Sequence, residues 1–196
     1  MEHYYSENPK SKSRIFHINY NIKDLELNFI ADTGVFSKTR VDYGTDILIK
    51  SLPPLHGKIL DLGCGYGPIG ISLAKLNPSC QITMVDINNR AVELSRQNIQ
   101  QNNVENAIVL QSDGFEKVDG LFNAIVSNPP IRAGKKVIYP LFEHSIDYLD
   151  KDGALYLVIQ KKQGAKSTLE KLTEIYGNCE VINKKGGYWI LRSIKT

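Results

Sequence analysis

From about residue 58 onward, short apolar runs alternate with longer amphipathic segments. The apolar runs have the length of strands, and they occupy residues 58–62, 81–86, 106–110, 122–127 and 153–160. The segments between them repeat their apolar residues at helical spacing, and they predict helices over 68–76, 88–102, 135–149 and 164–176. Strands that alternate with helices predict a parallel sheet, because a long crossover is needed to reach a parallel neighbour.

The last two strands break this alternation. Residues 179–184 and 187–194 are separated only by a short turn around Gly186, which predicts a hairpin. A short turn cannot join parallel neighbours, so the final strand must run the other way. The pattern therefore predicts an α/β fold with a seven-stranded, mostly parallel sheet and an antiparallel terminal strand.

The N-terminal part of the chain has a different pattern. Two alternating segments, residues 15–20 and 25–31, predict a short β-hairpin, and residues 44–52 predict a helix that leads into the first core strand. The chain has 196 residues, which is near the usual size of one domain. We therefore expect residues 1–56 to form an extension that packs on a core of residues 57–196.

Composition narrows the class of protein. Hydrophobic residues make up 42% of the chain and charged residues 23%, as in a globular protein. No apolar run is long enough to span a membrane, and the N-terminus lacks the apolar segment of a secretory signal, so we expect a cytoplasmic protein. The three cysteines and four histidines are scattered without paired spacing, which argues against a disulfide framework and against a metal site.

A glycine-rich turn follows the first core strand. It runs from Asp61 through Gly63, Gly65 and Gly67 to Gly70. Glycines let the backbone turn sharply and approach a ligand closely, and the following helix offers free N–H groups. The last three glycines also satisfy the dinucleotide pattern G-x-G-x-x-G, but a carboxylate at Asp61 disfavours a pyrophosphate and suits a ligand with an ammonium group.

This turn resembles the first motif of the class I S-adenosylmethionine-dependent methyltransferases, which have a Rossmann-like fold. The resemblance implies that Asp61, Gly63, Gly65 and Gly67 bind the methionyl end of S-adenosylmethionine, the expected cofactor. It also implies that Asp86 binds the ribose and that Ile87 lies beside the adenine ring. Asp113 and Gly114 would hold the adenine amine. An ordinary turn is the alternative interpretation of that last pair.

Asn128, Pro129 and Pro130 directly follow the strand at 122–127. In an open parallel sheet, ligands bind beyond the carboxyl ends of the strands where the strand order reverses, and the first and fourth core strands should flank that point. The tripeptide resembles the fourth motif of methyltransferases that modify planar exocyclic or amide nitrogens, which implies that it is catalytic and that Asn128 lies beside the cofactor. The Asn128 side-chain oxygen and the Pro129 carbonyl would accept the two hydrogens of the target nitrogen, and the prolines would stiffen the loop.

The residue after the tripeptide, Ile131, departs from methyltransferases of adenine and of glutamine amides, which usually carry an aromatic residue there. Together with Gly34–Ser37 and Asp42-x-Gly44-Thr45, the tripeptide looks most like the methyltransferase domain of the bacterial 16S ribosomal RNA guanine exocyclic-amine methyltransferases. The resemblance covers about residues 25–195, and it implies transfer to a guanine amine. The best-known members carry a duplicated domain, for which 196 residues leave no space.

The net charge of +3 is unevenly distributed, since residues 131–196 carry twelve basic and seven acidic side chains. Basic residues follow three of the predicted strands at their carboxyl ends: Arg132, Lys135, Lys136, Lys161, Lys162, Lys184 and Lys185. Such a basic rim would attract phosphates, although a solvated lysine-rich surface is the alternative. We expect a monomer that binds ribosomal RNA or a small-subunit particle. The residues expected to bind it are Arg132, Lys135, Lys136, Lys161 and Lys162, together with Phe36 and Ser37.

Three other functions stay open. A protein glutamine-amide methyltransferase would share the tripeptide, but Ile131 and the basic rim count against it. An NAD-linked oxidoreductase would use the glycine pattern, but Asp61 and the tripeptide count against it. A non-catalytic RNA-binding module would keep the fold without the chemistry, but the intact turn and tripeptide argue against such decay.

Overall fold

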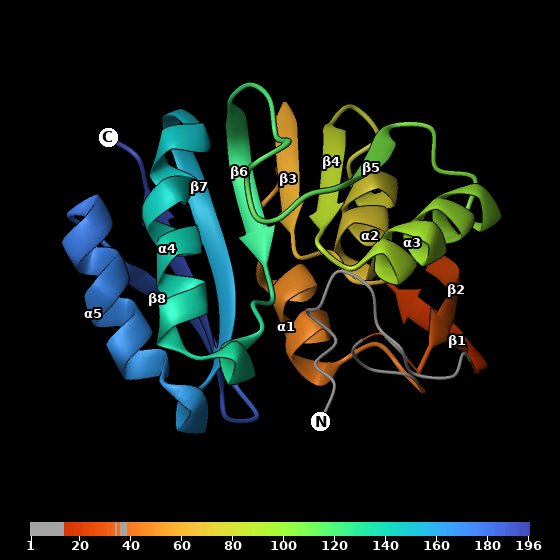
Figure 1. Ribbon diagram of the computed structural model, residues 1–196, viewed down its shortest axis with the longest axis horizontal. Coiled ribbons are helices and arrows are strands. Elements are labelled where there is room, and N and C mark those ends of the chain that lie inside the picture. The colour runs from red at the N-terminus through yellow and green to blue at the C-terminus, as the bar shows by residue number, and fades with distance from the viewer. Residues whose placement is uncertain (1–13, 34, 36–38) are drawn as a thin grey trace.

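A seven-stranded sheet forms the centre of the computed structural model, which describes residues 14–33, 35 and 39–196 (Figure 1). Its strands are β3 (Lys58–Leu62), β4 (Gln81–Asp86), β5 (Ala107–Gln111), β6 (Phe122–Ser127), β7 (Leu149–Gln160), β8 (Glu180–Lys185) and β9 (Tyr188–Ile194). They lie in the order β5-β4-β3-β6-β7-β9-β8, and β9 runs antiparallel to β7 and β8 while the other neighbours are parallel. The predicted Rossmann-like fold is therefore confirmed.

Helices cover both faces of the sheet (Figure 1). They are α1 (Tyr43–Ser51), α2 (Pro68–Leu76), α3 (Asn89–Gln101), α4 (Lys135–Ser145) and α5 (Ala165–Tyr176), with short 3₁₀ turns η1 (Ile131–Ala133), η2 (Ile146–Tyr148) and η3 (Lys161–Gln163). Successive strand residues point to opposite faces. Ile59 accordingly joins the apolar cluster under α1, α2 and α3, and Leu60 joins the cluster under α4 and α5.

The largest difference from the predicted boundaries lies between α4 and β7, and the other boundaries agree with the prediction to within two residues. Helix α4 ends at Ser145 and β7 begins at Leu149, whereas the sequence pattern predicts a helix to residue 149 and a strand from residue 153. Leu149 pairs with Phe122 of β6 and is fully buried. The pairing and burial of this leucine outweigh the helical periodicity of the preceding segment.

The predicted N-terminal hairpin consists of β1 (Ile15–Ile22) and β2 (Leu25–Asp32), which form a separate two-stranded sheet. Two asparagines one turn apart, Asn98 of α3 and Asn102 directly after its end, bind the hairpin backbone. The Asn98 amide accepts from the Ile30 N–H at 2.7 Å and donates to the Ile30 carbonyl at 2.9 Å, and Asn102 makes the same pair of bonds with Asn28. Asn98 also donates to the Tyr66 carbonyl at 2.8 Å, so the hairpin is fastened to the glycine-rich turn.

Within the described ranges, no helix is long and apolar enough to cross a membrane. The same residues contain no group of three or more His, Cys, Asp or Glu side chains that could hold a metal ion.

Candidate active site

A cavity of about 970 Å³ opens beyond the carboxyl ends of β3, β4 and β6. Strands β3 and β6 are neighbours, with β4 and β5 on one side and β7 on the other, so the strand order reverses between them. This is the place where open α/β sheets bind ligands. Residues predicted for the site line it as follows: Gly63, Gly65, Asp86, Ile87, Asp113, Gly114, Asn128, Pro129, Pro130 and Arg132.

The other predicted site residues do not line the cavity. Asp61, Gly67, Lys135, Lys136, Lys161 and Lys162 lie outside the lining that the described residues form. The four lysines are exposed, and they follow β6 and β7 at the edge of the sheet that holds the cavity. Phe36 and Ser37 lie outside the described residues, so their predicted role in substrate binding stays a prediction.

The glycine-rich turn forms one wall of the cavity. Gly65 and Gly67 have φ angles of 59° and 99°, a left-handed backbone that side chains disfavour. The N–H groups of Gly63 and Cys64 both donate to the Val85 carbonyl at 2.9 Å, which ties the turn to the end of β4. A Cβ atom built on Gly63 or Gly65 would meet no atom within 4 Å, so the space before the turn is open to a ligand.

Asp61 lies under this turn and is fully buried. Its Oδ2 accepts a hydrogen bond from the Gly70 N–H at 2.8 Å, and its buried Oδ1 has no hydrogen-bond partner among the described residues. Burial raises the pKa of Asp61 to about 7, the bond from Gly70 opposes this shift, and the negative charge of Asp86 adds to it. One buried carboxylate oxygen next to the glycine-rich turn is therefore left without a hydrogen bond to offset its loss of hydration.

The raised pKa of Asp61 predicts how stability depends on pH. The folded protein keeps a proton on Asp61 from its ordinary pKa of 3.8 up to about 7, whereas the unfolded chain releases it. The contribution of Asp61 to the free energy of unfolding is therefore greatest at low pH, and it falls as pH rises through this window. Asp61→Asn should lack this fall in urea unfolding of the ligand-free protein at about pH 5 and pH 8, and identical pH dependence in both proteins would refute the assignment.

Asp86 lies at the end of β4 with both carboxylate oxygens anchored. Its Oδ2 accepts from the Gly65 N–H at 2.8 Å, and its Oδ1 accepts from the Asn88 N–H at 2.9 Å. Burial raises the pKa of Asp86, and these backbone hydrogen bonds oppose the shift. Each oxygen keeps a further lone pair, so Asp86 can also accept hydrogen bonds from a ligand with two neighbouring hydroxyls.

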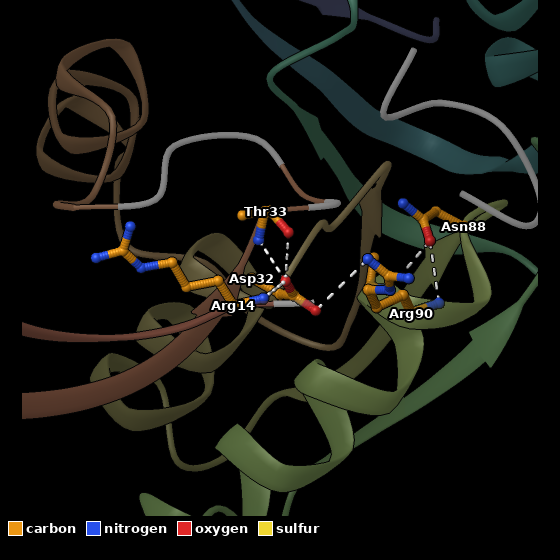
Figure 2. Close-up of polar contacts among 6 residues, drawn as sticks. Arg14, Asp32, Thr33, Asn88 and Arg90 are labelled. Atoms are coloured by element: carbon orange, nitrogen blue, oxygen red, sulfur yellow. Dashed lines mark hydrogen bonds and ion pairs between the residues drawn. The ribbon is translucent and has the colours of Figure 1, made fainter. Parts of the chain in front are cut away.

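The end of the N-terminal hairpin also reaches the cavity, through Thr33 and Val35. The buried carboxylate of Asp32 holds this end in place, as Figure 2 shows. Its Oδ1 accepts from the Arg14 N–H at 2.9 Å and from the Thr33 hydroxyl at 2.8 Å, and its Oδ2 lies 3.6 Å from the Arg90 guanidinium on α3. The ion pair joins the hairpin to the helix that follows β4, and it thereby stabilises this part of the cavity rim.

Asn128 lies in the cavity wall, where its side chain contacts the start of α1. Its Nδ2 donates to the Asp42 carboxylate at 3.2 Å and to the Thr45 hydroxyl at 2.9 Å. Both hydrogens of the amide nitrogen are thereby used. The side-chain oxygen of Asn128 is left available as an acceptor for a ligand in the cavity.

The carbonyl of Pro129 is the second predicted acceptor. It accepts from the Ile131 N–H at 2.8 Å, and the Pro130 carbonyl accepts from the Ala133 N–H at 2.8 Å, which folds the loop into η1. A carbonyl has two lone pairs, so Pro129 can accept one further bond. The loop therefore presents two acceptors from consecutive residues, Asn128 and Pro129. The proline rings restrict the backbone that carries them.

Sequence reasoning missed Tyr188 and Val137, which also line the cavity. Tyr188 is the first residue of β9 and pairs with Gln160 at the carboxyl end of β7. Its ring packs edge-on against that of Tyr43, with 5.9 Å between the ring centroids. The predicted terminal hairpin could have indicated Tyr188, because its turn brings the start of the last strand to the edge of the sheet that holds the cavity.

The sheet order, the glycine-rich turn after β3, the acidic residue that ends β4 and the Asn-Pro-Pro tripeptide after β6 together define a class I methyltransferase architecture. The methyltransferase small domain family matches residues 26–192, and the chain belongs to this family. The resemblance inferred from the two sequence motifs is therefore confirmed.

Individual relatives agree with this assignment. The chain is 48% identical over 198 residues to the uncharacterized protein YbxB of Bacillus subtilis, covering 99% of this chain and 98% of that protein. It is 43% identical over 139 residues to ribosomal RNA small subunit methyltransferase C of Aeromonas hydrophila, covering 69% of this chain and 40% of that protein.

A solved structure is also similar. It is the T. thermophilus 16S rRNA N2 G1207 methyltransferase (RsmC) in complex with AdoMet and guanosine, which matches with a TM-score of 0.83 and 26% identity. The match covers 95% of this chain and 51% of that chain. The chain thus spans about half the length of this structure, and 40% of the Aeromonas protein.

Proposed function

We propose that this protein is an S-adenosylmethionine-dependent methyltransferase that modifies the exocyclic amine of guanine in 16S ribosomal RNA. The pair of acceptors after β6, the Asn128 side-chain oxygen and the Pro129 carbonyl, carries the proposal. An exocyclic amine has two N–H bonds and a delocalised lone pair, so two fixed acceptors suit it. Ribosomal RNA and guanine are supported by the Aeromonas relative and by the guanosine-bound T. thermophilus structure.

The cavity residues fit S-adenosylmethionine. The open space before Gly63 and Gly65 suits its methionyl end, and the unpartnered Oδ1 of Asp61 supplies negative potential for the ammonium group there. Asp86 has spare lone pairs for the two ribose hydroxyls. Ile87 offers apolar surface for the adenine ring, and we assign the adenine amine to the segment of Asp113 and Gly114.

The residues of this chain hold the target amine and orient it. When bound, S-adenosylmethionine supplies the electrophilic methyl group. Asn128 and Pro129 accept the two N–H hydrogens of the target amine, so that its lone pair points into the cavity. Pro129 and Pro130 fix these acceptors before the substrate arrives, which spares reorganisation during the reaction. The amine would release one proton to solvent as its new C–N bond forms and the methyl C–S bond breaks, with S-adenosylhomocysteine as the leaving group.

The basic rim is proposed to bind the RNA backbone. All seven of its side chains are exposed, and Arg132 also lines the cavity. Lysine and arginine bind phosphates without reading base sequence. A guanine must leave its stack to reach Asn128, so a loop or single-stranded site is favoured over a duplex.

The rim can be tested by its salt dependence. The triple variant Arg132→Ala, Lys135→Ala and Lys136→Ala should bind a 16S ribosomal RNA transcript more weakly, and the negative slope of log affinity against log salt should become shallower by roughly 2. The control is Lys58→Ala with Lys151→Ala, since these exposed lysines lie near the amino ends of β3 and β7. Equal slopes for the triple variant and the wild type would mean that these three residues of the basic rim do not bind RNA phosphates.

The proposed reaction is tested by nucleoside mass spectrometry of ribosomal RNA from cells with and without the gene. A methylated guanosine that is lost with the gene and restored by the wild-type protein supports both the base and the substrate. An unchanged set of methylated guanosines would reject guanine in ribosomal RNA as the target. Calorimetry separates the cofactor from the target, because S-adenosylmethionine should bind and NAD should not.

A further inference from the structure

The segment Asp42-x-Gly44-Thr45 carries contacts that the proposed reaction does not yet use. It begins α1, where the Asp42 carboxylate caps the helix by accepting from the Gly44 N–H at 2.9 Å and from the Thr45 N–H at 3.2 Å. A helix cap needs only one side-chain oxygen and tolerates several residue types. Capping therefore does not explain why a threonine follows three positions later.

The same two side chains also contact Asn128, which directly follows β6. The Asp42 Oδ2, the same oxygen that caps α1, and the Thr45 Oγ1 both accept from the Asn128 Nδ2, at 3.2 Å and 2.9 Å. Thr45 is only 3% exposed, and both residues line the cavity. The contact joins positions more than eighty residues apart, at the point where the proposed substrate nitrogen must lie.

We propose that Asp42 and Thr45 are positioning residues that hold the Asn128 amide with its oxygen toward the substrate, an inference that rests on the proposed function. An ionised carboxylate can only accept hydrogen bonds, so Asp42 selects the nitrogen end of the amide. Rotation of the amide by half a turn would place its N–H groups against the N–H groups of the target amine. The pair thus makes the site selective for a substrate group that donates hydrogen bonds.

Gly44 gives this segment a further constraint. A Cβ atom at Gly44 would lie 2.8 Å from the Tyr188 ring and 3.0 Å from the Asp42 carboxylate. The absence of a side chain therefore lets the cavity-lining tyrosine pack against the start of α1, while the carboxylate stays free to reach Asn128. This arrangement explains the residues found at Asp42, Gly44 and Thr45.

Thr45→Val and Thr45→Ser form a matched pair of variants. Valine has the shape of threonine but lacks the acceptor, and serine keeps it. With a 16S ribosomal RNA transcript, Thr45→Val should lower kcat by about 10- to 100-fold while the affinity for S-adenosylmethionine stays within about twofold, and Thr45→Ser should restore kcat. Thr168→Val is the control, because Thr168 is a buried threonine of α5 that is not in the cavity wall.

Asp42 is tested by Asp42→Ser, which keeps a good helix cap but has a shorter side chain with one oxygen. It should lower kcat with little change in thermal stability. If Thr45→Val and Asp42→Ser both transfer methyl groups as fast as the wild type, the positioning role is wrong.

A second measurement does not depend on catalysis. The side-chain amide protons of Asn128, identified by their loss in Asn128→Ala, should exchange with solvent more slowly than those of the exposed Asn89. Exchange should accelerate in Thr45→Val and slow again in Thr45→Ser. Unchanged exchange would overturn the proposal. A wild-type protein that transfers no methyl group to any RNA, but shows these exchange changes, would instead overturn the proposed function alone.

Discussion

Replacing Asn128 with alanine is expected to reduce methyl transfer by about 100- to 1,000-fold, because it removes one of the two acceptors proposed to orient the target amine. The remaining acceptor, the Pro129 carbonyl, cannot fix the direction of the nitrogen lone pair alone. Cofactor affinity should stay within about tenfold, or roughly 1.4 kcal/mol, because the glycine-rich turn and Asp86 are unchanged. Single-turnover transfer from radiolabelled S-adenosylmethionine to a 16S ribosomal RNA transcript measures the loss, and calorimetry measures the affinity.

Asn183→Ala provides the control for this variant. Asn183 is a half-buried asparagine of β8 whose Nδ2 donates to the Ser51 hydroxyl at 2.7 Å, and it is not in the cavity wall. It loses a side-chain hydrogen bond of the same kind, so it reports what such a loss does to the fold. Normal transfer by Asn128→Ala would remove Asn128 from the reaction, whereas equal losses in both variants would indicate a general effect on the structure.

The sheet and its ligand-binding edge follow from short-range patterns in the sequence. Alternating apolar runs and amphipathic segments predict parallel strands, and the short turn at Gly186 predicts an antiparallel last strand. The positions of Asp86 and Asn128 at strand ends then suffice to bring them to one cavity. These features are local, so one sequence is enough to predict them.

Contacts between distant side chains are not encoded in this way. Asn98 and Asn102 have the spacing of neighbours on a helix surface, but nothing in α3 indicates that they bind the backbone of β2. The segment from Asp42 to Thr45 has the pattern of a helix start, and its bonds to Asn128 depend on where α1 packs. The orientation of the Asn128 amide therefore becomes visible only in three dimensions.

Asp61 shows how burial changes the interpretation of a residue. The sequence predicts a carboxylate that points its charge at the turn, and the structure gives it one bond to Gly70 and one unpartnered oxygen. Its pKa, raised by burial to about 7, follows from the depth of this position under α2 and the turn. Burial of one side chain depends on the packing of several segments, so the motif alone does not predict it.

Replacing Asp86 with alanine is expected to weaken S-adenosylmethionine binding by about 100-fold or more. Two hydroxyl–carboxylate hydrogen bonds would be lost, each contributing roughly 1.5–3 kcal/mol when the acceptor is charged. Asp86→Asn keeps one acceptor oxygen, which can still accept from the Gly65 N–H but leaves the Asn88 N–H without its acceptor, so it should bind with intermediate affinity. Calorimetry with the wild type and both variants measures the difference.

The ribose contact can be separated from the support that Asp86 gives to the Gly65 and Asn88 backbone. Each protein is titrated with S-adenosylhomocysteine and with its 2′-deoxy analogue. The wild type should lose about tenfold in affinity for the analogue, whereas Asp86→Ala should bind both ligands alike, because the acceptor for the missing hydroxyl is already gone. Equal losses in both proteins would mean that Asp86 only supports the turn, and that the ribose is bound by other residues.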